Sequence, residues 1–543
     1  MKDVSYIFLC YFLLNTSLHT IVAQSSLNSQ SFNVKDFGAV GNGTVDDAVA
    51  IQKTLNAANS AGGGTVYFPT GNYLIKTTLI PYSNLQIIGS GESSVLKFVF
   101  PAYSQTKKVF YGWIFRNQKN VTFRNIAMNG GATQFDSNPV NVDGAYHIIY
   151  FNPESDNSVQ DIIIERCHFS YSFDSAIQSY GRSADKYPHP ITNRVNILNC
   201  QFRDTGAHGV GMNEWHNSMV INCDFENVGR KIMIKGYGSG MAVDVSAGSE
   251  NVVIINNKVR KAAGGFKAET HLNGDEEVAA KNVIIEDNSI LDLYEGPDYR
   301  VWYGIRVNGI RVSVKRNTIQ SYMHGILIAS KASECVIINN TILSTKANEA
   351  VGIRIDQGYG KHRIFGNKIN NAGAQGILVL GNSLTISNNI ISNSRLEGIR
   401  IADVKGVVCS NNIAFDNKSW NFSVAPINDT SEDVELSNNV SYQSLVSDQR
   451  KGINLSDKNV VNVTKSGNAN LNDSDTSPEV KSSFKEISST SRTIQMDAPP
   501  ITGNWNKGDI AFNSIPKPGN FVGWICQEAG SPGTWKGFGK IEP

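Results

Sequence analysis

One polar position recurs through the middle of this chain and limits the folds that it can adopt. The position holds asparagine or cysteine, and an apolar residue usually follows two places later. The last spacings are 23, 27, 22, 23 and 27 residues. A period of this length is typical of a solenoid, in which each repeat buries its apolar face only against its neighbours. The series is Asn125, Cys167, Cys200, Cys223, Asn257, Asn288, Asn317, Asn340, Asn367, Asn389, Asn412 and Asn439.

The residues between these positions favour β-strands. Strand-forming residues and glycine dominate each repeat, and helical periodicity is almost absent. The pattern therefore predicts an all-β fold, a parallel β-helix with one coil per repeat. In such coils we expect the asparagines to stack inside a turn, with their amides bonding from coil to coil. Cys167, Cys200 and Cys223 share this position, and we expect them to be buried and structural.

The two ends of the chain differ from the repeat. The first residues combine a positive start, an apolar run and a small-residue site before Gln24, a pattern that predicts a secreted protein. Near the other end, a polar stretch precedes a segment with paired glycines and tryptophans at hairpin-like spacing. The expected division is a signal peptide (1–23), a β-helix catalytic domain (24–469), a linker (470–478) and a small C-terminal β module (479–543).

Charge and hydropathy narrow the classes of partner. The chain has 49 basic and 48 acidic residues, a net charge of +1. This balance argues against a nucleic-acid partner, so charge must act locally in a groove. The apolar run near the start is too short to span a bilayer, and no later segment is long enough, so no membrane insertion is expected. The oligomeric state stays open.

The segment after the apolar start has a recognisable plan. A short strand and a glycine turn lead to Asp46-Asp47, after which the apolar residues of 48–58 share one helical face. The stretch NVKDFGAVGNGTVDDAVAIQKTLNAANSAGGGTVYFPTGNYLI resembles the opening of the pectate-lyase-like superfamily of secreted right-handed parallel β-helix proteins. That superfamily includes polysaccharide lyases, polygalacturonase-like hydrolases and tailspike depolymerases. The resemblance implies a right-handed coil whose open end the helix caps.

A glycine-led strand returns about ten residues after most of the recurring positions. Alternate side chains of a strand face opposite sides, so aligning these strands separates an inward set from outward columns. The inward set is Val210, Met212, Met241, Val243, Phe266, Ala268, Ile305 and Val307. The outward columns bring Asn213, Asp244 and Glu269 onto successive coils, with Lys267 and Arg306 beside them and Trp215, Ser246 and His271 further along.

Two coils are longer than the others at this point. The insertions 229–239 and 291–303 precede the strands of Asp244 and Arg306. Insertions on one face of a solenoid usually build its binding face. Their basic and aromatic side chains suit an acidic polysaccharide. The expected substrate contacts are Trp215, Tyr237, Tyr299, Arg300, Trp302, Tyr303 and His208.

This cluster predicts β-elimination on a polysaccharide that contains uronic acid. Asn213, Asp244 and Glu269 supply the hard oxygen ligands that Ca²⁺ prefers, and the ion would neutralise the uronate carboxylate. Lys267 would be the base, and Arg306 would neutralise charge or donate a proton. The possible substitutes for Arg306 are His271, His208 and Tyr303. The pattern resembles calcium-dependent β-helix lyases, although the ligands here come one per coil and one acid is aspartate.

Other interpretations remain open. Asp244 and Glu269 on adjacent coils could instead serve as the two carboxylates of a glycoside hydrolase. A uronate epimerase would share the apparatus for proton abstraction. A glycan-binding solenoid without catalysis would need no special cluster, because outward charges can be cross-strand ion pairs. The polymer itself is not specified by these residues.

Overall fold

The computed structural model of the chain falls into two compact units. The first unit ends at Val243 and includes Ser249–Val253, and the second holds Asp244–Gly248 and the chain from Ile254 onward. The predicted signal peptide and nearly all of the predicted linker lie outside the described residues. The described residues are 30–99, 110–132, 146–179, 190–229, 240–273, 276–294, 303–321, 323–442, 452–455, 459–470, 493–507, 509–515 and 517–540.

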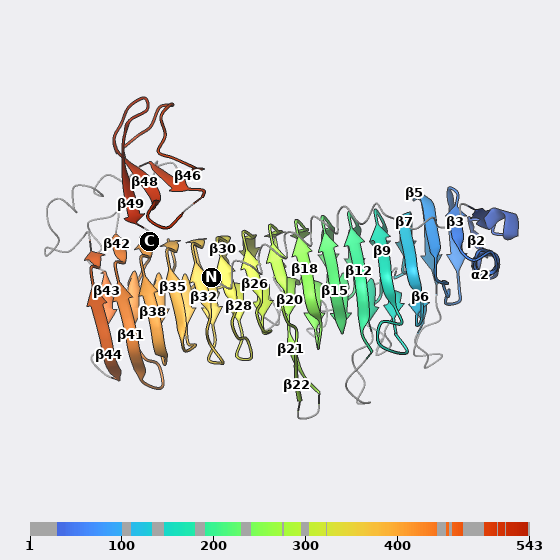
Figure 1. Cartoon of the computed structure of the whole chain (residues 1–543), viewed down its shortest axis with the longest axis horizontal. Coiled ribbons are helices and arrows are strands. Elements are labelled where there is room, and N and C mark those ends of the chain that lie inside the picture. The colour runs from blue at the N-terminus through green and yellow to red at the C-terminus, as the bar shows by residue number, and fades with distance from the viewer. Residues whose placement is uncertain are drawn as a thin grey trace. The chain divides into compact units, whose positions relative to one another are not determined.

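The first unit begins with the predicted helix. Helix α2 (Ala48–Ser60) buries Ala48, Ile51, Leu55 and Ala58, which are the apolar positions of one face. Figure 1 shows the helix beside β2 (Asn42–Asp46) and β3 (Gly64–Phe68), at the outer end of this unit's strands. Asp46 accepts the amide of Ala48 at 3.1 Å, so it satisfies one of the free N–H groups of the first turn.

Equivalent side chains of successive coils stack on one another inside the first unit. The phenyl rings of Phe169, Phe202 and Phe225 are almost parallel, with centroids 5.0 and 4.6 Å apart. The adjacent cysteines, Cys167, Cys200 and Cys223, are free thiols and buried, as predicted. The backbone N–H of Cys200 points at the sulfur of Cys223 at 3.4 Å, so the thiols occupy the place that asparagine amides take in later coils.

The start of the predicted series is wrong by one residue. Asn125 has a φ of 52°, whereas the other members of the series follow a residue with positive φ. Strand β10 (His168–Ser170) pairs Phe169 with Met128, not with Ala127. In this first coil Ile126, which is buried, therefore takes the recurring position, and Met128 is the counterpart of Phe169. Asn125 instead accepts a hydrogen bond from Arg166 at 2.9 Å.

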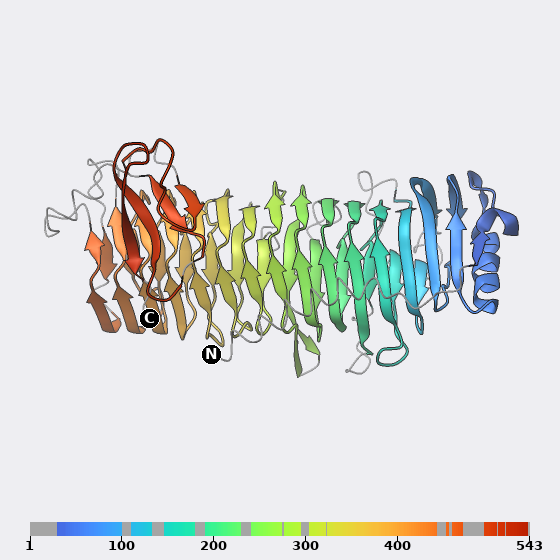
Figure 2. The same cartoon turned by 45° about the horizontal axis from the view of Figure 1, so that its top comes forward.

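The second unit is a right-handed parallel β-helix whose strands stack in chain order (Figure 2). One of its sheets carries the glycine-led strands, paired in parallel with the predicted register. From β20 to β40 the inward residues are fully buried, whereas those of β43 are half-buried, and β40 follows Asn421 in place of a glycine. These strands are β20 (Gly264–Ala268), β25 (Tyr303–Val307), β28 (His324–Ile328), β31 (Ile353–Ile355), β34 (Ile377–Val379), β37 (Ile399–Ile401), β40 (Phe422–Val424) and β43 (Ile453–Leu455).

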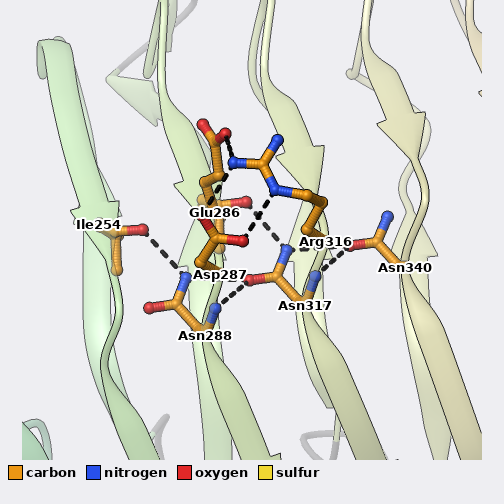
Figure 3. A network of polar contacts seen from close by, with 8 residues as sticks. Ile254, Glu286, Asp287, Asn288, Arg316, Asn317 and Asn340 are labelled. Carbon is orange, nitrogen blue, oxygen red and sulfur yellow. Dashed lines mark hydrogen bonds and ion pairs between the residues drawn. The ribbon is translucent and has the colours of Figure 1, made fainter. Parts of the chain in front are cut away.

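The predicted asparagine ladder runs through the turns of the second unit (Figure 3). Asn317 donates from its amide to Asn340 and to the carbonyl of Ile285, both at 2.9 Å. Asn288 bonds to Asn317 in the same way. Each buried amide thus satisfies backbone groups of neighbouring coils, which an apolar residue could not do. The series continues to Asn468, one coil further than the sequence pattern indicated.

The C-terminal segment forms its own four-stranded sheet of β46 (Thr493–Met496), β47 (Ile510–Asn513), β48 (Phe521–Glu528) and β49 (Thr534–Lys540). Trp505 and Trp535 meet edge to face, with centroids 5.3 Å apart. Each indole N–H bonds to a nearby carbonyl, which indicates a structural role for both rings. Among the described residues, no helix is both long and apolar enough to span a bilayer.

Candidate active site

The strand register of the second unit sets the position of the predicted charged cluster. In the pairing of β20 with β25, Lys267 lies beside Arg306, and Phe266 and Ala268 pair with Ile305 and Val307 on the opposite face. The same column continues to Leu327 and Arg354. Asp244 belongs to the second unit too, near the end of β17 (Met241–Ser246). The predicted outward columns are therefore confirmed from Lys267 onward.

Four of the predicted residues form a continuous chain of ion pairs. The ammonium group of Lys267 lies 3.0 Å from a carboxylate oxygen of Asp244 and 3.9 Å from Glu269. The same oxygen of Glu269 lies 3.1 Å from Nε of Arg306. The side chains of the first three residues are only 9–11% exposed, whereas that of Arg306 is 28% exposed. Arg306 is therefore the member of the chain that a solute reaches most easily.

Neighbouring polar groups hold this chain in place. Asn308 donates to Oε1 of Glu269 at 2.9 Å, and Ser246 donates to Oδ1 of Asp244 at 2.5 Å. The amide oxygen of Asn308 accepts the backbone N–H of Lys331 at 3.0 Å, which fixes the orientation of the Asn308 side chain. The site roles of Asn308 and Ser246 were missed from the sequence, although both lie on the predicted outward faces.

Tyr303, which is itself largely buried, lies beside Arg306 at the end of the ion-pair chain. Nη1 of Arg306 donates to the Tyr303 hydroxyl at 3.2 Å, and the guanidinium carbon lies 5.5 Å from the centre of the ring. Nε of Arg306 and Oε2 of Glu269 face each other without an aligned hydrogen bond. Within the described part of the chain, Arg306 thus makes only one side-chain hydrogen bond, and Nη2 stays available for an incoming anion.

The donor set does not fit the predicted calcium ion. Lys267 and Ser246 engage the carboxylate of Asp244, while Asn308, Lys267 and Arg306 surround that of Glu269. A cation among these oxygens would have to displace the ammonium group. The side-chain amide of the third predicted ligand, Asn213, donates to the carbonyl of Ser179 at 3.3 Å. The described residues contain no group of three His, Cys, Asp or Glu side chains placed to hold a metal.

Two predicted substrate contacts of the first unit have other surroundings. Trp215 is fully buried and packs edge to face on Phe151, with centroids 5.1 Å apart, so its assignment as a sugar platform is wrong. The cause is Glu214, whose φ of 54° ends β14 (Val210–Asn213) and turns the next residue inward. The half-buried ring of His208 accepts the backbone N–H of Met241 at 3.1 Å, which indicates a structural contact.

The remaining predicted residues divide into two groups. His271 lies on an antiparallel hairpin, β21 (Thr270–Asn273) with β22 (Glu276–Ala279), where it pairs with Val278. Figure 1 shows this hairpin leaving the sheet, so His271 does not extend the strand of Lys267 as expected. Tyr237, Tyr299, Arg300 and Trp302 lie outside the described residues.

Comparisons with known proteins agree with the fold. Residues 31–267 match the family described as "Rhamnogalacturonase A/epimerase, pectate lyase-like", and residues 303–494 match the "Right handed beta helix region". The tailspike protein of E. coli bacteriophage HK620, solved with a hexasaccharide, has a TM-score of 0.56 at 12% identity, over 80% of each chain. The chain is therefore a right-handed parallel β-helix protein. Its first part, residues 31–267, matches a pectate-lyase-like family, as its opening residues predicted.

Two curated relatives from Azotobacter vinelandii share part of this sequence. The chain is 28% identical over 249 residues to mannuronan C5-epimerase AlgE3, which is 43% of this chain and 12% of the epimerase. It is 30% identical over 218 residues to alginate lyase 7, which is 36% of this chain and 22% of the lyase. The matches thus span less than a quarter of the length of either relative.

Proposed function

We propose that this protein is a secreted enzyme that removes the C5 proton of hexuronate residues in an acidic polysaccharide, with β-elimination as the outcome. The ion-pair chain that ends at Arg306 and Tyr303 carries this proposal. Support comes from the names of the two Azotobacter relatives, a mannuronan C5-epimerase and an alginate lyase. Both names refer to uronate polymers, and both reactions begin at the C5 hydrogen.

Arg306 provides the carboxylate-binding part of this chemistry. The C5 hydrogen becomes acidic only when the negative charge of the uronate carboxylate is neutralised. Arg306 is partly exposed, and its Nη2 has no partner among the described residues, so it can meet that carboxylate directly. A guanidinium group forms paired hydrogen bonds with a carboxylate, and such charge-assisted bonds are stronger than neutral ones. Glu269 and Asn308 hold the rest of the side chain in place.

Tyr303 is the group best placed to exchange the proton. Its oxygen already accepts a hydrogen bond from Arg306, which holds the hydroxyl beside the group that would bind the uronate carboxylate. In the proposed step the oxygen of Tyr303 takes the C5 proton, the electron pair forms the C4–C5 double bond, and the C4–O bond breaks. The same hydroxyl then returns its proton to the departing oxygen. The predicted base, Lys267, instead carries a proton toward Asp244 in this arrangement, so the geometry favours Tyr303.

The same contacts disfavour hydrolysis by Asp244 and Glu269. A glycosidase needs one carboxylic acid that can protonate the leaving oxygen. Here both groups form ion pairs, which require the carboxylate form. Epimerisation is the second candidate, because the relative AlgE3 catalyses it on mannuronan by name. It differs from elimination only in the last step, in which a proton returns to C5 from the opposite side.

Two variants test the assignment against a matched control. We expect Tyr303→Phe to reduce kcat at least a hundredfold on a uronate polymer, which is typical for loss of a general acid–base group. Arg306→Lys keeps the charge but loses the paired geometry, and we expect it to raise KM and lower kcat. Arg354→Gln is the control, because Arg354 shares the outward column but forms its own pair with Asp356 at 2.7 Å.

Two assays separate the candidate reactions. Elimination produces an unsaturated uronate that absorbs in the ultraviolet, whereas hydrolysis yields reducing ends without that absorbance. Epimerisation in D₂O incorporates deuterium at C5 and leaves the polymer intact. If Tyr303→Phe and Arg306→Lys both retain the turnover of the Arg354→Gln control, the proposed site is wrong.

A further inference from the structure

A second group of polar and aromatic residues lies on the same sheet as Arg306, four coils further along the chain. Arg306 and Arg400 occupy one outward column, because the strand register runs from Arg306 through Leu327, Arg354 and Leu378 to Arg400. Each coil advances by roughly 4.8 Å, so the two arginines are about 19 Å apart along the coil axis. The group around Arg400 is therefore separate from the candidate active site.

The guanidinium group of Arg400 has few partners. Its Nε is buried without a hydrogen-bond partner, a feature that it shares with Arg306 and with no other arginine in the described part of the chain. Its Nη1 lies 3.8 Å from Glu397, which is too far for a hydrogen bond. Arg354 of the same column instead donates from Nε to Asp356 at 2.7 Å. The side chain of Arg400 is 25% exposed, so its remaining N–H groups can reach a ligand.

A carboxylate and an indole lie on the coils next to this guanidinium. Glu397 and Trp420 precede β37 and β40, and the backbone N–H of Gly398 donates to the carbonyl of Trp420 at 2.9 Å, so the two residues lie on successive coils. The carboxylate of Glu397 accepts a hydrogen bond from the side-chain amide of Gln375 at 3.0 Å, which holds it in place. Trp420 is half-buried. Neighbouring coils thus supply a donor, an acceptor and an aromatic ring near Arg400.

The charges around Arg400 do not favour an anion. Glu397 is one negative neighbour, at 3.8 Å. Asp403 is the second: although burial opposes the shift, the backbone N–H groups of residues 427–429 lower the pKa of Asp403, and Arg400 adds to this effect. An incoming carboxylate would therefore meet one cation and two carboxylates. A sugar hydroxyl carries no charge and both donates and accepts, so it suits a guanidinium beside a carboxylate.

We propose that Arg400, Glu397 and Trp420 form a binding site for an uncharged sugar. The guanidinium donates to one hydroxyl, the carboxylate accepts from another, and the indole ring packs on the apolar face of the sugar. This site requires no activity at Arg306. Only one statement rests on the proposed function, namely that the polymer bound here is the one that reacts at Arg306. The substrate is then a heteropolysaccharide, which carries neutral sugars a few residues away from the reacting uronate.

The test compares each binding group with a matched control in the full chain. Arg400→Gln removes the donor, Trp420→Ala removes the ring, and Trp420→Phe keeps a ring. Arg354→Gln is the control for the arginine, because Arg354 shares the column but is hydrogen-bonded to Asp356. Tyr359→Ala is the control for the indole. The Tyr359 residue is 63% exposed and follows β31, so it lies at the opposite edge of the sheet from Trp420.

Binding is measured with polymers of matched length at low and at high salt. Polymannuronate contains only uronate, whereas gellan and unsulfated chondroitin contain both uronate and neutral sugars. We expect the wild type to bind at least one mixed polymer more tightly than polymannuronate. Arg400→Gln and Trp420→Ala should bind that polymer roughly tenfold more weakly. Trp420→Phe should keep most of the affinity, and both controls should keep all of it. The loss should be the same at both salt concentrations, because the contacts are with uncharged hydroxyls.

Three results would overturn the proposal. The first is that the wild type binds neither mixed polymer more tightly than polymannuronate. The second is that Arg400→Gln and Trp420→Ala bind like their controls. The third is a loss that disappears at high salt or is equal for polymannuronate, because the site would then take a carboxylate. The proposed function fails separately: if no polymer is turned over but the mixed polymer still binds through Arg400 and Trp420, only the assignment of the active site is wrong.

Discussion

The contribution of the Lys267 ion pairs to the free energy of unfolding can be measured, and this measurement is the most direct test of the site geometry. Replacing Lys267 by methionine keeps the length of the side chain and removes its charge. The carboxylates of Asp244 and Glu269 then remain largely buried with fewer cations beside them. Asp244 would lose its ion pair with Lys267, while Glu269 would still have Arg306.

The expected magnitude follows from the distance and the burial. At 3.0 Å and an effective dielectric constant of about 20, two unit charges attract by about 5.5 kcal/mol. Removing one partner of a buried pair costs about 3–5 kcal/mol of folding stability, because the other charge stays desolvated. A pair on the surface contributes about 0–1 kcal/mol. The pair Lys405–Glu432, at the same 3.0 Å but with side chains 64% and 38% exposed, is such a case.

A double-mutant cycle separates the pair from the general effects of each substitution. The unfolding free energies of Lys267→Met, Asp244→Asn and the double variant give the coupling between the two side chains. We expect at least about 2 kcal/mol of coupling, because the double variant leaves no isolated charge between them. The same cycle on Lys405 and Glu432 should give less than about 1 kcal/mol. Equal coupling in both pairs would show that solvent reaches Lys267, and the geometry of the site would then be wrong.

Three further outcomes are expected. Asn317→Ala should lower the free energy of unfolding by about 2–4 kcal/mol, measured by denaturation, because it leaves the buried N–H of Asn288 and the carbonyl of Ile285 without the Asn317 side chain; an effect below about 0.5 kcal/mol would contradict the ladder. Burial and the nearby Arg354 lower the pKa of His324 from 6.5 to about 4, so the folded state binds fewer protons in that range; stability should be complete above about pH 6.5, fall by up to roughly 3 kcal/mol toward pH 4, and vary less with pH in His324→Gln. A calcium chelator should change neither the thermal midpoint nor turnover, because protein cations already neutralise Asp244 and Glu269; a loss of activity that calcium restores would contradict this.

The sequence was sufficient to predict the coils and the strand neighbours from Lys267 onward. The spacing of the asparagines predicted the ladder, and strand alternation placed Lys267 next to Arg306. Both inferences depend only on the repeat, since a parallel coil sets each residue beside its counterpart in the next coil. The cap helix followed from apolar positions one helical turn apart.

Features that depend on a single dihedral angle were not predictable in this way. Trp215 was assigned outward because alternation was extended through Glu214, a residue type that rarely adopts positive φ. The same limitation shifted Asn125 by one place. Asparagine tolerates the left-handed region, so a positive φ at Asn125 has a signal in the sequence, whereas the one at Glu214 has none.

Burial of the outward columns is what separates a catalytic interpretation from a structural one. Strand alternation predicts the face of a side chain but not what covers that face, and the outward face of a solenoid sheet is ordinarily open to solvent. The side chains of Asp244, Lys267 and Glu269 are instead 9–11% exposed, although a solenoid can place charges in water at little cost. Burying three charges stabilises the fold less than well-packed apolar residues would. Charged side chains that are buried in this way beside one accessible arginine are typical of a functional site rather than of a structural ion pair.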